Sequence, residues 1–482
     1  MSIFLTRKKQ SITYILLILN ILYFLARFWH ISLQKRTKNM RKHYSLLNVS
    51  IFLTLSTSTL AQSLTLDDCM RYAVEHSTAV NEKRLAADDS RSDYIESFGS
   101  FFPSISASVG GATNFGRSID PATNNYTNVT TFSNSYSLSA SMTLFDGLQN
   151  INTIRAAKVA RSLGAMESEI ASDETAMKTM SAYMDVVYYK EAVEIARLHL
   201  ESSQNTLQLT RQQYGLGLKS AADVAEIESQ TANYEYLLLT EENNLDLAYI
   251  KLRETMNYPQ DEELNIVTDI QLEPSINTHS KEELIEYSLL YNPRIAVAKQ
   301  ATEIKRLQLK RAQGAFAPSL YLYGGYNTNY FIDFDNKSAY DPFSTQFRNN
   351  RGAYIQLSLS IPIFTGLGRY SSYRKAKNAW RSAQFAQTAT ERAVESEVCE
   401  TWQQMHNTKK LYQQGDKKVN AAQLVYDGAS KKFEKGLISA LELQTASTTL
   451  LQAKAERLKA RLQHIIKQRM VDYYSGKPII RE

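Results

Sequence analysis

The positions of the prolines constrain this chain more than any other feature of its sequence. Nine prolines are present, and none falls within residues 122–258 or 363–477. Proline breaks helix interiors, and helices in globular proteins average about 11–12 residues, so tracts of this length favour unusually long helices. We predict helices at 148–214 and 367–433, each followed by a Gly-Leu turn and then a second, shorter helix.

The first long helix carries an apolar stripe rather than an apolar surface. A helix of this length would span about 100 Å, and it is too polar to lie in lipid. Its apolar residues recur in heptad-like steps, which require a neighbouring helix. These residues are Leu163, Met166, Ile170, Met177, Met180, Met184 and Val187. An ordinary coiled-coil rod would satisfy the same pattern.

Short alternating segments precede both long helices. In 135–144 serine and threonine alternate with Tyr136, Leu138, Ala140, Met142 and Leu144. Alternation of this kind predicts a strand with one polar and one apolar face. We predict four strands, at about 104–113, 133–145, 319–328 and 352–364. Strands of about ten residues match tilted transmembrane β-strands, although a small soluble β-layer over the helices would also fit.

Four strands are too few to close a barrel in lipid. Membrane barrels begin at about eight strands, and an unpaired strand edge within lipid is very costly. If the strands span a membrane, the chain must therefore oligomerise. A serine-lined interior then implies a water-filled pore, which the long helices would extend as a tube outside the membrane.

The chain contains the same unit twice. "LFDGL" at 144–148 corresponds to "IFTGL" at 363–367, and "YGLGLKSAADV" at 214–224 to "FEKGLISALEL" at 433–443. A period of this length indicates a duplicated domain rather than a short-repeat solenoid. Each copy is expected to begin with one helix of about 37 residues, capped at Thr65 or Ser280 and ending before Pro103 or Pro318. The units are 62–258 and 280–475, with a linker at 259–279 and a tail at 476–482.

The N-terminal segment has a composition of its own. Residues 1–61 hold nine Lys and Arg and no Asp or Glu, so the remainder has 46 basic and 49 acidic residues, a net charge of −3. The overall charge of +6 thus gives no support for nucleic-acid binding. Residues 40–61 resemble a signal peptide, and 1–39 are an upstream extension or an apolar anchor centred on 12–29.

No catalytic, cofactor or metal motif is evident in the sequence. H-E-x-x-H, the P-loop and G-x-S-x-G are absent, and the seven histidines are scattered. We therefore expect a protein that is not an enzyme and needs no cofactor. Cys69 and Cys399 fall at similar distances from their strands, and whether they pair is left open.

Taken together, these features resemble the TolC family of outer-membrane efflux and type I secretion channels. The resemblance rests on the duplicated plan, the "P-S" strand entries, the "LFDG" and "IFTG" corners and the paired "G-L-x-S" hairpins, and it covers 63–475. It implies a mainly α fold with a transmembrane β part, in which three chains share a twelve-stranded barrel continued by a periplasmic α-helical barrel, with the linker and C-terminus forming an equatorial belt.

The resemblance also implies a function and partners. The chain would be a passive exit duct in the outer membrane of a Gram-negative bacterium. Its partners would be two further copies of itself, outer-membrane lipid, a periplasmic adaptor (membrane fusion) protein and an inner-membrane RND or ABC transporter. The alternative is a membrane-anchored periplasmic coiled-coil structural or adaptor protein.

The two hairpin turns are the candidate site. Gly217 and Gly436 suit the left-handed position that closes a helix, and Ser220 and Ser439 suit N-caps. Asp223 and Glu442 follow at capping-box spacing. The resemblance adds that these acids face the closing pore, where symmetry would form carboxylate rings that favour cations.

Two further roles are expected at the same tips. The positions that hold a locking Tyr and Arg in the best-known family channels are Phe433 and Ile438 in this sequence, so we expect a hydrophobic closure instead of a polar lock. Residues of both hairpins are candidates for contact with the adaptor, although packing within the hairpin would also explain them. They are Leu216, Gly217, Leu218, Ser220, Gly436, Leu437 and Ser439.

The loops 114–132 and 329–351 are expected outside the cell. They are dotted with aromatic residues, some of which would form an interfacial belt while others pack within the loops. These residues are Phe115, Tyr126, Phe132, Tyr330, Phe331, Tyr340, Phe343 and Phe347.

Overall fold

The computed structural model describes residues 63–481, apart from 120–123, 129, 269 and 271–279. The chain divides into the units Met1–Gln62 and Ser63–Glu482, and all the described residues belong to the second. The expected signal peptide, the extension at 1–39 and much of the linker therefore lie outside the described residues.

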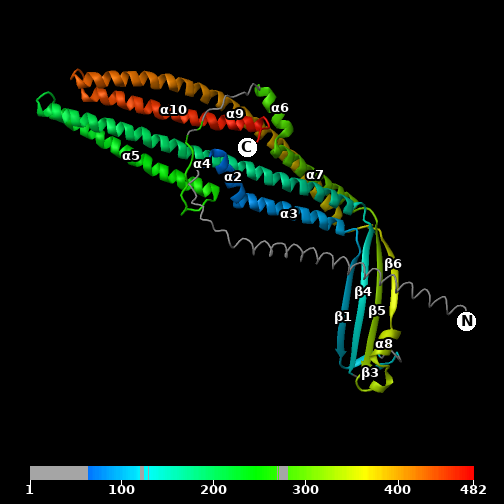
Figure 1. Ribbon diagram of the computed structural model, residues 1–482. Coiled ribbons are helices and arrows are strands. Elements are labelled where there is room, and N and C mark those ends of the chain that lie inside the picture. The colour runs from blue at the N-terminus through cyan, green and yellow to red at the C-terminus, as the bar shows by residue number, and fades with distance from the viewer. Residues whose placement is uncertain (1–62, 120–123, 129, 269, 271–279, 482) are drawn as a thin grey trace, which may run out of the picture. The chain divides into compact units, whose positions relative to one another are not determined.

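Helices dominate the described part, and four long strands form its main sheet (Figure 1). In chain order the elements are α2 (Leu66–His76), α3 (Thr78–Gly99), β1 (Ser104–Asn114), β2 (Arg117–Ile119), β3 (Tyr126–Asn128), β4 (Thr131–Phe145), α4 (Gln149–Gly215), α5 (Ala221–Met256), α6 (Lys281–Tyr291), α7 (Pro293–Gly314), β5 (Ser319–Asp333), α8 (Phe343–Asn349), β6 (Gly352–Ser360), α9 (Gly368–Glu434) and α10 (Ala440–Tyr474). The expected fold class, mainly α with a four-stranded β part, is confirmed.

The duplication is visible in the order of elements. The run α2–α3–β1–β4–α4–α5 repeats as α6–α7–β5–β6–α9–α10. The helices α4 and α9 each have 67 residues and begin one residue later than expected. The predicted apolar stripe of α4 is fully buried at Met180, Met184 and Val187, where it enters the main hydrophobic core.

The first helix of each copy is not continuous, and this expectation was wrong. In the first copy it breaks at Ser77, whose Oγ accepts from Val80 N at 3.3 Å and caps α3. In the second it breaks at Asn292, whose Oδ1 accepts from Arg294 N at 2.9 Å. Pro293 follows as the first residue of α7. Proline cannot donate within a helix but suits its first turn, so the break follows from local chemistry.

The main sheet is antiparallel, with strand order β1-β4-β5-β6. Two strand ends differ from expectation: β5 continues to Asp333, and β6 stops at Ser360 rather than 364. Pro362 follows closely after that end, and proline cannot donate a hydrogen bond to a ladder. The register places Leu138 opposite both Ala107 and Tyr326, so both pairs share one face of the sheet.

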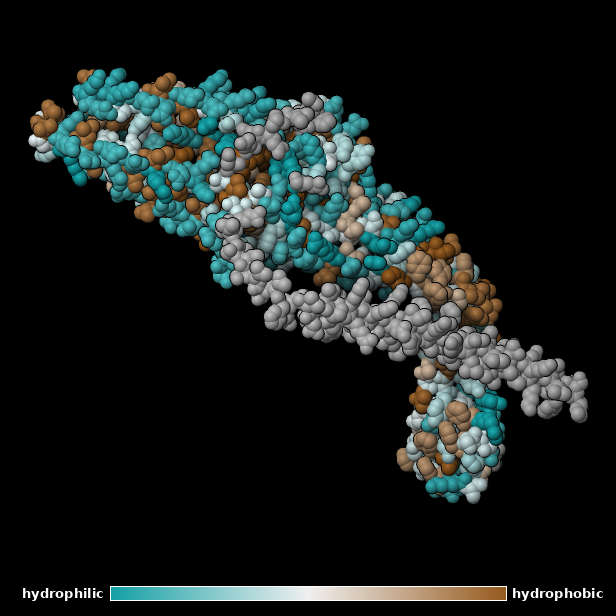
Figure 2. All heavy atoms as spheres, in the orientation of Figure 1, coloured by the Kyte–Doolittle hydropathy of each residue, from teal (hydrophilic) through white to brown (hydrophobic). Residues whose placement is uncertain are grey.

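The two faces of this sheet differ in polarity along all four strands. We call apolar face the set Ile105, Ala107, Val109, Leu138, Ala140, Met142, Leu320, Leu322, Tyr326, Ala353, Ile355, Leu357 and Leu359, which the register aligns. The opposite, polar face carries a serine ladder, in which Ser106 and Ser139 share a hydrogen bond of 2.8 Å and Ser108 and Ser137 one of 2.7 Å. Figure 2 shows brown, hydrophobic residues exposed on the sheet and at the adjoining helix ends.

Two left-handed residues stand directly before each long helix. Gly147 and Leu148 have φ of 69° and 67°, and Gly366 and Leu367 have 61° and 66°. The Asp146 carboxylate then accepts from Asn150 N at 2.8 Å and satisfies a free amide of the first turn of α4. Residues 146–148 thus connect β4 to α4, whereas the longer segment 361–367 connects β6 to α9.

The long helices pair into two hairpins, α4 with α5 and α9 with α10. The largest hydrophobic core gathers around Tyr183, Met180 and Leu252, and it includes Leu264 and Ile266 of the linker and Ile479 of the tail. Among the described helices, none combines the length and the apolar character needed to span a bilayer.

Candidate functional site at the hairpin tips

The two hairpin turns have the same geometry. In the first, Gly217 has a φ of 74° and its N–H donates to Tyr214 O at 2.9 Å, while Leu218 N donates to Gln213 O at 2.9 Å. In the second, Gly436 has a φ of 72° and its N–H donates to Phe433 O at 2.9 Å, while Leu437 N donates to Lys432 O at 2.9 Å. Both glycines thus adopt the predicted left-handed conformation, which satisfies carbonyls at the end of the long helix.

Serine caps begin the return helices. Ser220 Oγ accepts from Asp223 N at 3.1 Å, and Asp223 Oδ2 accepts in turn from Ser220 N at 2.9 Å. The hydrogen bonds from the Ser220 hydroxyl and amide lower the pKa of Asp223. Ser439 Oγ accepts from Glu442 N at 3.2 Å. Local capping is therefore an observed role of Asp223, and its carboxylate remains charged well into the acidic range.

The two tips are packed against one another. Gln213 Nε2 donates to Glu434 O at 3.2 Å, and a hydrophobic cluster around Ile227, Phe433 and Leu443 joins the hairpins. Phe433 is only 1% exposed, with Lys219 Nζ 4.1 Å from its ring centre. The side chain expected to close a pore by hydrophobic contact is thus already enclosed within its own chain. Of the two lock positions, Ile438 remains partly exposed.

Three tip leucines point outward. Leu216, Leu218 and Leu437 are 75%, 71% and 69% exposed. Packing within the hairpin, the alternative explanation for these residues, therefore does not account for them. Figure 2 shows hydrophobic residues at the hairpin ends. Exposed apolar side chains gathered at one place commonly mark a contact surface.

Buried polar residues also connect the two hairpins behind the tips, and the sequence analysis did not predict these contacts. Tyr234 Oη and Ser447 Oγ lie 2.7 Å apart, and Ser202 Oγ and Tyr426 Oη also 2.7 Å, so hydroxyl pairs link the two hairpins. His199 is 5% exposed beside Ser447, and burial, aided by the charge of Lys454, lowers its pKa to about 4. The only signal in the sequence was polar residues at positions where a coiled coil places apolar ones.

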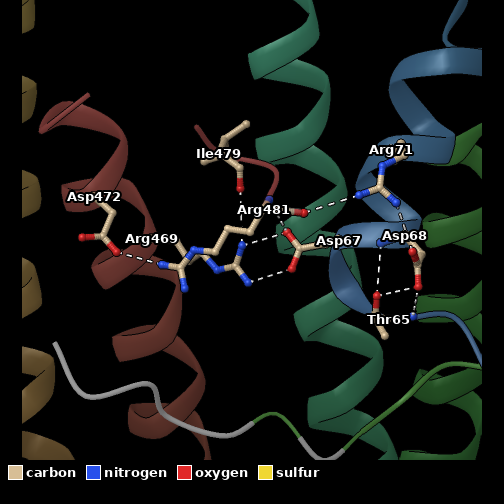
Figure 3. Close-up of polar contacts among 8 residues, drawn as sticks. All are labelled: Thr65, Asp67, Asp68, Arg71, Arg469, Asp472, Ile479 and Arg481. Atoms are coloured by element: carbon tan, nitrogen blue, oxygen red, sulfur yellow. Dashed lines mark hydrogen bonds and ion pairs between the residues drawn. The ribbon is translucent and has the colours of Figure 1, made fainter. Parts of the chain in front are cut away.

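A second polar network, which we call the waist network, comprises Asp67, Arg469, Asp472 and Arg481 (Figure 3). The Arg469 guanidinium donates to both carboxylate oxygens of Asp67, at 2.9 and 3.0 Å, and Arg481 N donates to Asp67 at 2.9 Å. Arg481 Nη2 lies 2.8 Å from Asp472 Oδ2. Burial alone would raise the pKa of Asp67, but the hydrogen bonds and charges of Arg469 and Arg481 lower it.

The linker joins the helices at the same level. Leu64 pairs with Ile266 in an isolated parallel bridge, and Tyr183 Oη donates to Val267 O at 2.5 Å. Arg461 Nη2 donates to Ile270 O at 2.7 Å. The described part of the linker and the C-terminal tail thus both pack on the middle of the long helices.

The two cysteines do not pair. Cys69 and Cys399 are both free, and Cys69 is fully buried, which raises the pKa of its thiol to about 12. Within the part of the chain that the structure describes, no group of His, Cys, Asp and Glu is arranged to hold a metal ion.

The profile of a family described as "Outer membrane efflux protein" matches residues 71–257 and 284–476. Among curated proteins, Outer membrane protein TolC of Vibrio cholerae is 23% identical over 293 residues, which cover 60% of this chain and 65% of that protein. Outer membrane efflux protein BepC of Brucella suis is 22% identical over 84% of each chain. The first alignment thus spans slightly less than two thirds of its relative.

Solved structures show the same fold. The Campylobacter jejuni CmeC outer membrane channel superposes with a TM-score of 0.75 at 15% identity, over 86% of this chain and 87% of that one. The outer membrane protein VceC of Vibrio cholerae has a TM-score of 0.72 at 16% identity, over 86% and 96% of the two chains.

Proposed function

The chain belongs to the outer membrane efflux protein family, and from this premise we propose that it is the outer-membrane exit duct of a tripartite efflux pump or a type I secretion system. Its family and fold are those of passive channels. The observation that carries the proposal is the sheet with one apolar and one polar face, in which β4 and β6 each lead to a long helix through a short connection. A periplasmic rod has no use for such a sheet.

The dimensions of the apolar face suit a membrane. The apolar side chains run from Ala353 along β6 and continue at Ile361 and Ile363. At about 3.3 Å per residue and a tilt of about 35–45°, β6 rises about 19–22 Å, and with the isoleucines beyond it this approaches the apolar band of about 25 Å in outer-membrane barrels. Exposed aromatic residues flank it at the helix end, among them Phe102 and Phe364, as in an interfacial belt.

A homotrimer completes the barrel in this proposal. Within the described residues, β1 and β6 each pair with one strand only, so the sheet ends in two open edges. Open edges in lipid carry unsatisfied amides and carbonyls that cost several kcal/mol each, and pairing β1 of one copy with β6 of the next removes them. Three copies give twelve strands, with the serine ladder facing a water-filled lumen.

The hairpin tips are the proposed periplasmic end. There the outward leucines would contact a periplasmic adaptor, and Asp223 and Glu442 would form rings of negative charge that favour cations. A passive duct has no energy source, so an inner-membrane RND or ABC transporter would drive the substrate. The closure would use Ile438 and the exposed leucines, since Phe433 is enclosed.

The proposal is tested by locating the chain and its oligomer. Inner and outer membranes are separated, and the protein is run on a gel without heating and then sequenced from its N-terminus. A chain in the outer membrane that migrates near three times its mass is expected. A monomer in the inner membrane that retains residues 12–29 would instead establish the anchored coiled-coil protein. A deletion strain, tested for sensitivity to toxic compounds and for loss of secreted proteins, then separates efflux from secretion.

A further inference from the structure

The short helix α8 lies on the apolar face of the sheet, not over the lumen. Its Phe347 ring centre is 5.1 Å from that of Tyr136, and its Phe343 ring is 5.3 Å from Tyr330. Tyr136 and Tyr330 belong to the face of β4 and β5 that carries Leu138 and Tyr326. The loop therefore folds back over the surface that faces lipid in the proposed barrel.

Hydrogen bonds hold α8 in this place. Gln346 accepts from Phe331 N at 3.1 Å and donates to Phe331 O at 2.9 Å, while Thr328 Oγ1 donates to Phe347 O at 2.7 Å. Asn350 Nδ2 donates to Asn329 O at 3.0 Å. Because these bonds reach the strand backbone, α8 is a fixed part of the outer end of the sheet.

Two exposed arginines lie at the C-terminal end of this helix, Arg348 within it and Arg351 just after it. Arg348 follows Phe347 by about 100° around the helix and is exposed, and Arg351, also exposed, directly precedes β6. Among the described residues, neither arginine forms an ion pair with a carboxylate. The acids of the loop lie elsewhere: Asp335 accepts from Thr130 N at 3.4 Å, and Asp341 precedes the opposite end of α8.

The order of these groups along the barrel axis matches the layers of a bilayer. Apolar side chains up to Ala353 come first, the aromatic rings of α8 follow beside Tyr136, and Arg351 directly precedes β6 at this same end. Aromatic residues prefer the membrane interface, and a guanidinium fork fits phosphate with two parallel hydrogen bonds.

From this arrangement we propose that α8 is an interfacial anchor and that Arg348 and Arg351 bind the phosphate of lipid headgroups in the outer leaflet. The inference rests on the proposed outer-membrane location. The ligand is a membrane lipid that bears an accessible phosphate with net negative charge. Zwitterionic headgroups fit less well because their own cation competes for the phosphate.

Native mass spectrometry of the detergent-solubilised full chain tests this site, with phosphatidylglycerol and phosphatidylcholine as probes. The Arg348→Gln/Arg351→Gln variant is compared with Lys409→Gln/Lys410→Gln, which removes the same charge from exposed positions of α9. We expect the wild type and the lysine variant to prefer phosphatidylglycerol about tenfold, and the arginine variant to lose that preference. Arg348→Lys/Arg351→Lys should retain part of it, because charge remains while the fork is lost.

Several outcomes would overturn the inference. An unchanged preference in the arginine variant, or an equal loss in the lysine variant, would show that general charge attracts the lipid. Displacement of the lipid by inorganic phosphate would show a site for free anions. The unheated oligomer is checked for every variant. If the wild type is not an outer-membrane oligomer, the proposed function fails first; an intact oligomer without lipid preference removes only this inference.

Discussion

Arg469 and Asp67 lie 402 positions apart in the chain and form a two-pronged ion pair, with Nη–Oδ distances of 2.9 and 3.0 Å. The pair connects α10 to the first turn of α2, and Arg481 adds the tail to the same carboxylate. The beginning and the end of the described chain are thus tied together at one point.

Arg469→Ala should destabilise the protein by about 2–3 kcal/mol, because it leaves a half-buried carboxylate without its main partner. Thermal unfolding followed by far-UV circular dichroism measures the effect. The control is Arg197→Ala, which removes an exposed ion pair to Glu194 and should cost under about 1 kcal/mol. If both variants lost the same free energy of unfolding, the waist network would have no special role in stability.

The same pair predicts a dependence on pH. The pKa of Asp67 is lowered, so its contribution is fully present above the ordinary carboxyl pKa of about 3.9 and is lost as the pH falls through the folded value. The stability difference between wild type and Arg469→Ala should therefore shrink in strong acid. A difference that stays constant from neutral pH to about pH 2 would argue against this assignment.

His199 predicts a second pH effect at a higher range. Its pKa of about 4 in the folded state lies below the ordinary value of about 6.5, so the unfolded chain binds more protons between these values. Stability should fall as the pH drops from 6.5 to 4, by up to about 3 kcal/mol. His199→Leu should flatten this part of the unfolding profile, which unfolding measured at several pH values would show.

Gly314→Ala should disturb the corner between β4 and α4. A Cβ on Gly314 would lie 2.3 Å from the carbonyl oxygen of Gly147, so the two segments must separate, at a cost of about 1–3 kcal/mol. Gly428→Ala is the matched change within α9, where no atom lies within 4 Å, and it should stabilise by about 0.5–1 kcal/mol. Chemical unfolding of both variants gives the sign of each effect.

The double variant Asp223→Asn/Glu442→Gln removes the negative charges at the tips but keeps side chains that can cap the helices. The side-chain carbonyl oxygen of asparagine can still accept from Ser220 N, so the free energy of unfolding should change by less than about 1 kcal/mol. If the acids form rings around the pore, the preference of the channel for cations over anions should fall severalfold in the double variant. Single-channel currents in planar bilayers measure this preference. An unchanged reversal potential under a salt gradient would leave capping as their role.

Leu216→Ser, Leu218→Ser and Leu437→Ser combined should impair efflux or secretion without loss of stability, because all three side chains are exposed. Leu424→Ser, on an equally exposed side chain of α9, serves as the control. Sensitivity of the complemented deletion strain to toxic compounds, or its yield of secreted protein, reports the effect. Full complementation by the triple variant would exclude these leucines as an essential contact.

Most of the architecture could be predicted from the sequence, because it depends on local patterns. Alternation in 135–144 predicted a two-faced strand, the proline-free tracts predicted the long helices, and the glycines at 217 and 436 predicted the turns. Each of these features depends on residues within a few positions of one another, where backbone geometry sets the spacing. The break at Pro293 was equally local, and it was missed although the proline marked it.

Only the tertiary structure decided which distant segments meet. No local pattern could show that Phe433 is enclosed by the opposite hairpin, that Arg469 reaches Asp67, or that α8 turns onto the apolar face. These contacts depend on how the hairpins and strands are aligned over hundreds of residues. The sequence by itself thus determined the helices and strands and the polarity of their faces. Packing determined which side chains remain exposed and available for function, because burial depends on neighbours that are remote in the chain.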